Sequence, residues 1–149
     1  MNKIFTISLK KEFVKEEKKV KLAIAKILKI LNKKNVSVEI YLAGSRTMRS
    51  LNKKLRGKDK VANVLSFEEP EEFIQNPPDR GTTQNKRKMT RNLGEIYLNA
   101  EREDENFSKE FLLVHGILHL LGYDHIKESD AIKMGRKEKS VLVKLKIEK

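Results

Sequence analysis

Two spacings of hydrophobic residues run along this chain, and each predicts a different kind of element. Residues 4–9 and 36–42 alternate between apolar and polar side chains, which is typical of a strand with one buried face. Residues 13–31 repeat their apolar side chains at intervals of three and four, which predicts an amphipathic helix. The other expected elements are strands at 61–67 and 93–99 and helices at 48–55, at 107–121 and from Ser129 onward.

Small and polar residues mark where the later helices begin or end. Gly44 and Ser45 offer an N-cap for the short helix, and Gly57 can terminate it. Gly122 ends the third helix, and Ser129 is expected to cap the last one.

The segment 107–121 is apolar on nearly all sides, which distinguishes it from the other helices. A helix of that kind is buried, so we expect it at the centre of the domain. The elements follow the order β-α-β-α-β-β-α-α, which predicts an α+β fold with helices packed on a small mixed β-sheet. The length of 149 residues is typical of a single domain, here residues 1–149.

Residues 68–92 show no hydrophobic periodicity. They hold all three prolines of the chain, and they change from acidic at the start to basic at the end. A loop of this length is usually functional or mobile, and the pattern leaves its role open.

Charge points to the partners of this domain. The chain carries 33 Lys and Arg against 21 Asp and Glu, a formal net charge of +12. Nucleic acids and anionic membranes are the usual partners of so basic a domain. Lysines crowd the polar side of helix 13–31, either as a solvated face or as a surface that faces RNA.

Several classes of protein are excluded by residue types and segments that the sequence lacks. There is no cysteine, which excludes a disulfide scaffold and a zinc site with cysteine ligands. No apolar run approaches the roughly 20 residues that span a bilayer, and the first residues lack a signal-peptide pattern. We therefore interpret the sequence as that of a soluble cytoplasmic protein without membrane association.

The chain has three histidines, and all of them lie on or just after the expected central helix. His115 and His119 are four residues apart, so both rings project from one helix face and can bind one metal ion. Gly122 accepts a positive φ at little cost, and a turn there can return His125 as a third ligand. Three protein ligands leave one tetrahedral position open, as in a catalytic zinc site.

The histidines and the identity of the metal each have an alternative interpretation. A lone buried histidine is more often a hydrogen-bonded core residue, but three at this spacing favour a metal site. Imidazole also suits nickel, copper and iron, and the open tetrahedral geometry favours zinc among them.

The histidine spacing also matches that of metzincin proteases, with one departure. Those enzymes need a glutamate directly after the first histidine as general base, and here that residue is Gly116. The nearest carboxylate is Asp124, which lies beside His125. It can orient a ligand imidazole, assist the attacking water, or simply form the turn.

The run HGILHLLGYDH, from His115 to His125, resembles the signature of the YbeY family, the bacterial rRNA maturation factors. The segments LNKKLRGKD at 51–59 and NVLSF at 63–67 resemble the family's central segment, and LGEI at 93–96 resembles the strand before its histidine helix. The resemblance covers nearly the whole chain. It implies a single-strand-specific metallo-endoribonuclease that acts in maturation of the 3′ end of 16S rRNA and in ribosome quality control.

The resemblance also implies roles for individual residues. The family's zinc-binding histidines correspond to His115, His119 and His125, and its active-site arginine corresponds to Arg56. A guanidinium suits that role because it stays charged and can contact two oxygens of a negatively charged phosphate transition state. A solvated arginine near a helix end is the alternative. The implied partners are single-stranded rRNA of the small subunit and ribosomal proteins.

Three functions therefore compete. The first is a zinc-dependent endoribonuclease with Arg56 and Asp124 at its site. The second is a metallopeptidase of modified zincin type, for which casein digestion that a chelator abolishes would be evidence. The third is a non-catalytic ribosome-assembly factor with structural zinc. It predicts that His119→Ala unfolds the protein and that the wild type binds RNA without cutting it.

Overall fold

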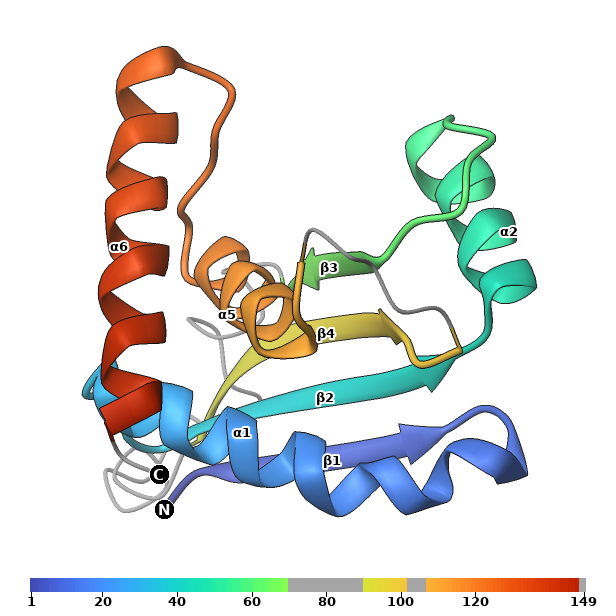
Figure 1. Cartoon of the computed structure of the whole chain (residues 1–149), viewed down its shortest axis with the longest axis horizontal. Helices are drawn as coiled ribbons and strands as arrows, with labels where there is room; N and C mark the ends of the chain where they lie inside the picture. The colour runs from blue at the N-terminus through green and yellow to red at the C-terminus, as the bar shows by residue number, and fades with distance from the viewer. Residues whose placement is uncertain (70–89, 102–106, 148–149) are drawn as a thin grey trace, which may run out of the picture.

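The computed structural model describes residues 1–69, 90–101 and 107–147 (Figure 1). The elements in chain order are β1 Lys3–Ser8, the 3₁₀ helix η1 Lys11–Glu16, α1 Glu17–Ile30, β2 Val36–Ala43, α2 Ser45–Arg56, β3 Val64–Glu68, β4 Arg91–Asn99, α5 Lys109–Leu120 and α6 Glu128–Ile147. The predicted α+β fold is confirmed. Most of the expected 68–92 loop lies outside the described residues. None of the helices in the described part of the chain is long and apolar enough to cross a membrane.

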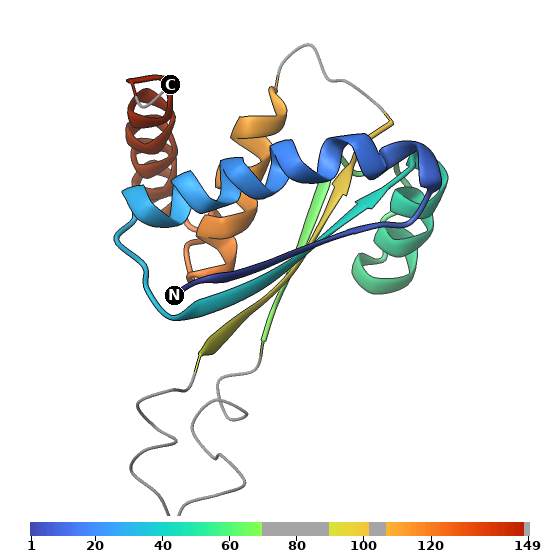
Figure 2. The same cartoon turned by 90° about the horizontal axis from the view of Figure 1, so that it is seen from below.

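The sheet has four strands in the order β1-β2-β4-β3. The strands β1, β2 and β4 are parallel, and β3 pairs antiparallel with β4 at the edge, so the sheet is mixed as predicted. The helices α1 and α5 lie on the same side of the sheet, and α6 packs against both (Figure 2). Because α5 contacts β3 and β4, the histidine helix lies over the edge of the sheet that carries β3.

The main core lies between the sheet and the helices on its covered face. Its fully buried side chains include Ile24 and Leu28 of α1, Ile40 of β2, Ile96 of β4 and Ile117 of α5. Fully burying one such side chain stabilises the fold by about 1.5–3 kcal/mol relative to leaving it in water. The prediction that the apolar helix is central is therefore confirmed.

The first expected helix is divided into two parts. The α-helix begins at Glu17, and the residues before it form the 3₁₀ helix η1. In that turn the amide of Phe13 donates to the carbonyl of Lys10 at 3.0 Å, and the Phe13 side chain is buried. The tighter helix brings Phe13 into the core directly after β1, a tertiary effect that periodicity does not show.

The structure also differs from the prediction at the first residues of β3 and α6. The strand predicted at 61–67 begins at Val64, because pairing with β4 begins there. The prediction that Ser129 caps the last helix is wrong. The amide of Ala131 already donates to the carbonyl of Lys127 at 2.9 Å, so Ser129 lies inside the first turn.

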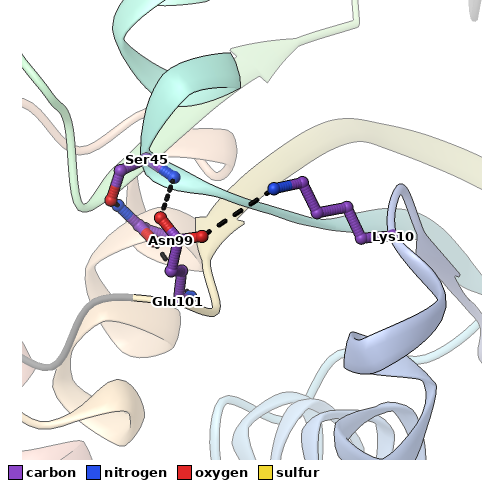
Figure 3. Close-up of polar contacts among 4 residues, drawn as sticks. All are labelled: Lys10, Ser45, Asn99 and Glu101. Atoms are coloured by element: carbon purple, nitrogen blue, oxygen red, sulfur yellow. Dashed lines mark hydrogen bonds and ion pairs between the residues drawn. The ribbon is translucent and has the colours of Figure 1, made fainter.

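The start of α2 is fixed by residues from other elements (Figure 3). Its N-cap is Gly44, which has no side chain to cap with, and the amide of Ser45 donates instead to Glu101 Oε1 at 3.2 Å. Asn99 Nδ2 donates to Ser45 Oγ at 3.1 Å, and Lys10 Nζ lies 3.8 Å from Glu101 Oε2. The hydrogen bond from Ser45 holds the pKa of Glu101 below its usual value. A negative charge at a helix N-terminus is favourable, so this carboxylate stabilises the start of α2.

Gly94 of β4 is expected to tolerate no larger residue. Its φ is +130°, and an added Cβ would lie 2.1 Å from the backbone oxygen of Phe67. Gly94→Ala is therefore expected to lower the free energy of unfolding by at least about 2 kcal/mol, measured by urea denaturation. The control is Gly135→Ala in α6, where an added Cβ has nothing within 4 Å. It is expected to raise stability by up to about 1 kcal/mol, and equal effects of the two variants would contradict the prediction.

Candidate metal centre

The histidine cluster is built by α5 and the turn that follows it. His115 and His119 lie on successive turns of α5, with ring centroids 4.5 Å apart. Gly122 has a φ of +99°, the left-handed conformation for which glycine was predicted. The chain then returns His125, whose ring centroid lies 5.7 Å from that of His115 and 5.1 Å from that of His119. The predicted convergence of the three rings is confirmed.

The nitrogen atoms of this cluster fit a single metal ion. The Nε2 atoms of His115 and His119 are 3.0 Å apart, and one ligand atom from each histidine lies within 4.8 Å of the other two. Two nitrogens bound to one tetrahedral zinc, each at about 2.0–2.1 Å, would be roughly 3.3 Å apart. The donor type therefore suits zinc, and the 3.0 Å separation of the His115 and His119 nitrogens is close to the value for one ion.

A carboxylate on the last helix contacts one of the rings. Nδ1 of His115 lies 2.5 Å from Glu138 Oε2, within hydrogen-bond distance, and the Glu138 side chain is only 11% exposed. Glu138 is absent from the residues predicted for the site, although the sequence holds a signal for it. It lies four residues after Met134 and three before Val141, inside the buried apolar stripe of α6. An acid at such a position needs a buried partner.

The surroundings of His119 favour its neutral form. Burial, followed by charge on His115 and His125 and the charge of Arg56, lowers the pKa of His119 from 6.5 to about 4. A hydrogen bond with the backbone of Tyr123 acts in the opposite direction. Because a neutral imidazole offers its lone pair directly, metal binding at neutral pH displaces no proton from an imidazolium here.

The lowered pKa of His119 makes the stability of the metal-free protein depend on pH. Between the folded-state pKa of about 4 and the unfolded value of about 6.5, the unfolded chain binds more protons than the folded one. The free energy of unfolding is therefore expected to be undiminished by this group above pH ~6.5 and to decrease as the pH falls toward ~4. Urea unfolding of the metal-free protein, prepared with a chelator, measures this free energy across the same pH range. His119→Gln removes the titrating group, so a pH dependence as steep as that of the wild type would contradict the prediction.

Arg56 lies at the end of α2, next to Gly57, whose φ of +70° ends the helix as predicted. Its Nη2 donates to the backbone carbonyl of Ser66 at 2.7 Å, and its guanidinium carbon lies 5.0 Å from the centre of the Phe67 ring. A guanidinium has five N–H donors, and the bond to Ser66 uses one of them. The arginine therefore contacts β3 through one of these donors and through the face of its guanidinium.

A cleft of about 800 Å³ joins these residues. The three histidines and Arg56 line it together with Asp124, Ser66 and Phe67. Residues from α2, β3 and α5 and from the turn after α5 therefore contribute to one concave site. Its size lies within the range of small-molecule and substrate sites.

Asp124 and Gly116 have different surroundings. Oδ1 of Asp124 accepts a hydrogen bond from the amide of Ile126 at 3.2 Å, so this side chain shapes the turn that carries His125. A catalytic role for Asp124 stays a prediction.

Gly116 faces the sheet, and a Cβ added there would lie 3.1 Å from Cδ1 of Ile96. A glutamate at position 116 would meet β4 instead of the cleft, so the general base of a metzincin protease has no room.

Fold and site together define a class of protein. It is an α+β domain whose buried helix presents histidines of metal-ligating geometry to a cleft that also holds an arginine. A family model described as endoribonuclease YbeY matches residues 4–146. The chain therefore belongs to the YbeY family of endoribonucleases, and the resemblance seen in the histidine motif is confirmed.

Individual relatives agree with this assignment. An endoribonuclease YbeY from Persephonella marina is 38% identical over 127 residues, which cover 79% of this chain and 71% of the relative. One from Finegoldia magna is 35% identical over 133 residues, which cover 83% and 78%. The solution structure of TM1509 from Thermotoga maritima matches with a TM-score of 0.53 and 27% identity, covering 95% of this chain and 86% of that one.

Proposed function

We propose that this chain is a zinc-dependent hydrolase that cuts single-stranded RNA and acts on the 3′ end of 16S rRNA during ribosome maturation and quality control. The observation that supports this most is that three histidine ligand atoms lie within 4.8 Å of one another in the cleft that also contains Arg56. Membership of an endoribonuclease family supports RNA as the substrate.

In this proposal each residue of the site has a distinct task. His115, His119 and His125 hold the zinc ion, which supplies Lewis acidity toward the scissile phosphate and water. Arg56 contacts the phosphate oxygens as negative charge develops on them. Because Ser66 and the Phe67 ring already hold the guanidinium, little reorganisation is needed when substrate arrives. Asp124 keeps the turn that presents His125 and is the candidate for orienting the attacking water.

RNA binding in this proposal depends on the excess of positive charge. The chain has a formal charge of +12. Part of this charge lies near the site, because Lys53 and Lys54 share the last turn of α2 with Arg56, and Lys58 lines the cleft. Phosphate contacts of this kind weaken as salt rises. The proposed partners are single-stranded rRNA and ribosomal proteins, and the proposed compartment is the cytoplasm, where that rRNA is found.

The two alternatives are not favoured. A metallopeptidase of the zincin type lacks its glutamate at position 116, and Ile96 fills the space in which such a side chain would begin. A non-catalytic assembly factor does not agree with a family of endoribonucleases or with ligand nitrogens that line an open cleft.

Removal of the metal tests the proposed function. Chelation is expected to abolish cleavage of a single-stranded 16S 3′-end fragment, and one equivalent of zinc is expected to restore it. The same sequence annealed into a duplex is expected to resist, and a DNA copy shows whether the 2′-OH is required. Cleavage that survives chelation would contradict the metal mechanism. Casein digestion without RNA cleavage would support the peptidase instead.

A further inference from the structure

Glu138 is an acid within an otherwise apolar buried stripe. Met134, Val141 and Leu145 are the other buried residues of α6 whose side chains are described, and they pack in the main core. The remaining acids of the helix, Glu128 and Asp130, lie in its first turn. A carboxylate in such a stripe destabilises the fold unless a partner compensates the loss of water.

The partner of this carboxylate is a histidine of the candidate metal centre. Glu138 Oε2 lies 2.5 Å from Nδ1 of His115, and the His115 side chain is itself 25% exposed. The His115 ring also stacks with that of Phe111, and the two centroids lie 5.9 Å apart. Because α6 packs on α5 through buried residues, the packing of two helices sets this contact.

The contact decides which nitrogen of His115 is offered to a metal. A carboxylate accepts hydrogen bonds, so the proton of the imidazole lies on Nδ1, between the two side chains. The lone pair is then on Nε2, the atom that lies 3.0 Å from Nε2 of His119. Carboxylates in this position also raise the donor strength of a ligand imidazole.

We propose that Glu138 is the positioning residue for His115, which fixes its tautomer and ring orientation and so connects the C-terminal helix to the metal centre. This inference rests on the proposed function, since it requires that His115 bind a metal. Coupling of this kind is reciprocal. Zinc binding therefore strengthens the packing of α6 on α5, and loss of the carboxylate weakens zinc binding.

The test measures zinc affinity in competition with a chromophoric chelator for the full-length wild type, Glu138→Gln and Glu138→Ala. Glu138→Gln keeps the shape and an acceptor but loses the charge, and it is expected to bind zinc about tenfold more weakly. Glu138→Ala loses the acceptor as well and is expected to bind up to about a hundredfold more weakly. The matched control is Glu128→Gln, an exposed acid at the start of the same helix, which is expected to bind as the wild type does.

Two further measurements separate positioning from a merely structural role. Long-range ¹H–¹⁵N spectra of the metal-free protein are expected to show His115 protonated at Nδ1 in the wild type and in a tautomer mixture in Glu138→Gln. Hydrogen exchange is expected to slow in α6 when zinc binds the wild type, and to change less in the variant. If a folded Glu138→Gln variant kept the zinc affinity and the His115 tautomer of the wild type, this inference alone would be overturned. A wild type that binds no zinc would overturn the metal centre and the inference together.

Discussion

His119→Ala is expected to lower the rate of RNA cleavage by at least about a thousandfold. A metal ion at such a site supplies several kcal/mol of transition-state stabilisation, and each 1.4 kcal/mol corresponds to about a factor of ten. The centroid of the His119 ring lies 4.5 and 5.1 Å from those of His115 and His125. Its loss leaves two of the three ligands, which do not hold the ion firmly. The measurement is cleavage of the single-stranded 16S 3′-end fragment by identically purified proteins.

The variant is also expected to stay folded, because alanine favours the helix and the packing of α5 comes from its other faces. Circular dichroism and thermal unfolding check this, and Ser140→Ala, at an exposed position of α6, is the matched control for purification. Equal cleavage by wild type and His119→Ala would mean a contaminating nuclease or a site that needs no metal. An unfolded variant, together with a wild type that binds RNA without cutting it, would support the assembly-factor alternative. The absence of cleavage by either folded protein would point to that alternative or to the ribosome itself as the required substrate.

Arg56→Ala is expected to lower kcat by about a hundredfold to a thousandfold. Removing one preorganised donor to developing negative charge has effects of this size in other enzymes. The zinc affinity is expected to stay near that of the wild type, because Arg56 contacts Ser66 and Phe67 and is not one of the metal ligands. Arg56→Lys is expected to recover only part of the rate, since an ammonium lacks the planar pair of donors.

Arg49→Ala provides the matched control for this arginine. Arg49 lies on the same helix, and its Nε is 2.7 Å from Asp59 Oδ1 in an ion pair whose two side chains are 58% and 52% exposed. Such pairs contribute little to stability, so this variant should keep a cleavage rate close to that of the wild type. If Arg56→Ala cleaved RNA as fast as Arg49→Ala, the assignment of Arg56 to the phosphate would be wrong.

Much of the site is visible in the sequence because it is local. His115 and His119 are one helical turn apart, and Gly122 is a residue type that tolerates a left-handed turn, so the convergence of three rings follows from short-range geometry. The central position of α5 follows in the same way from side chains that are apolar on nearly all faces. The position of Arg56 beside these rings was suggested by motif resemblance, not by any spacing.

The sequence by itself determined the order of the main strands and α-helices, the α+β class and the three-histidine cluster, since each depends on residues close together in the chain. Only the tertiary structure decided the strand order, the Glu101 carboxylate that caps α2, the contacts of Arg56 with β3, and the bond between Glu138 and His115. These contacts join residues 10 to 56 positions apart. Their formation depends on how the sheet and helices pack in three dimensions, which no local spacing of side chains encodes.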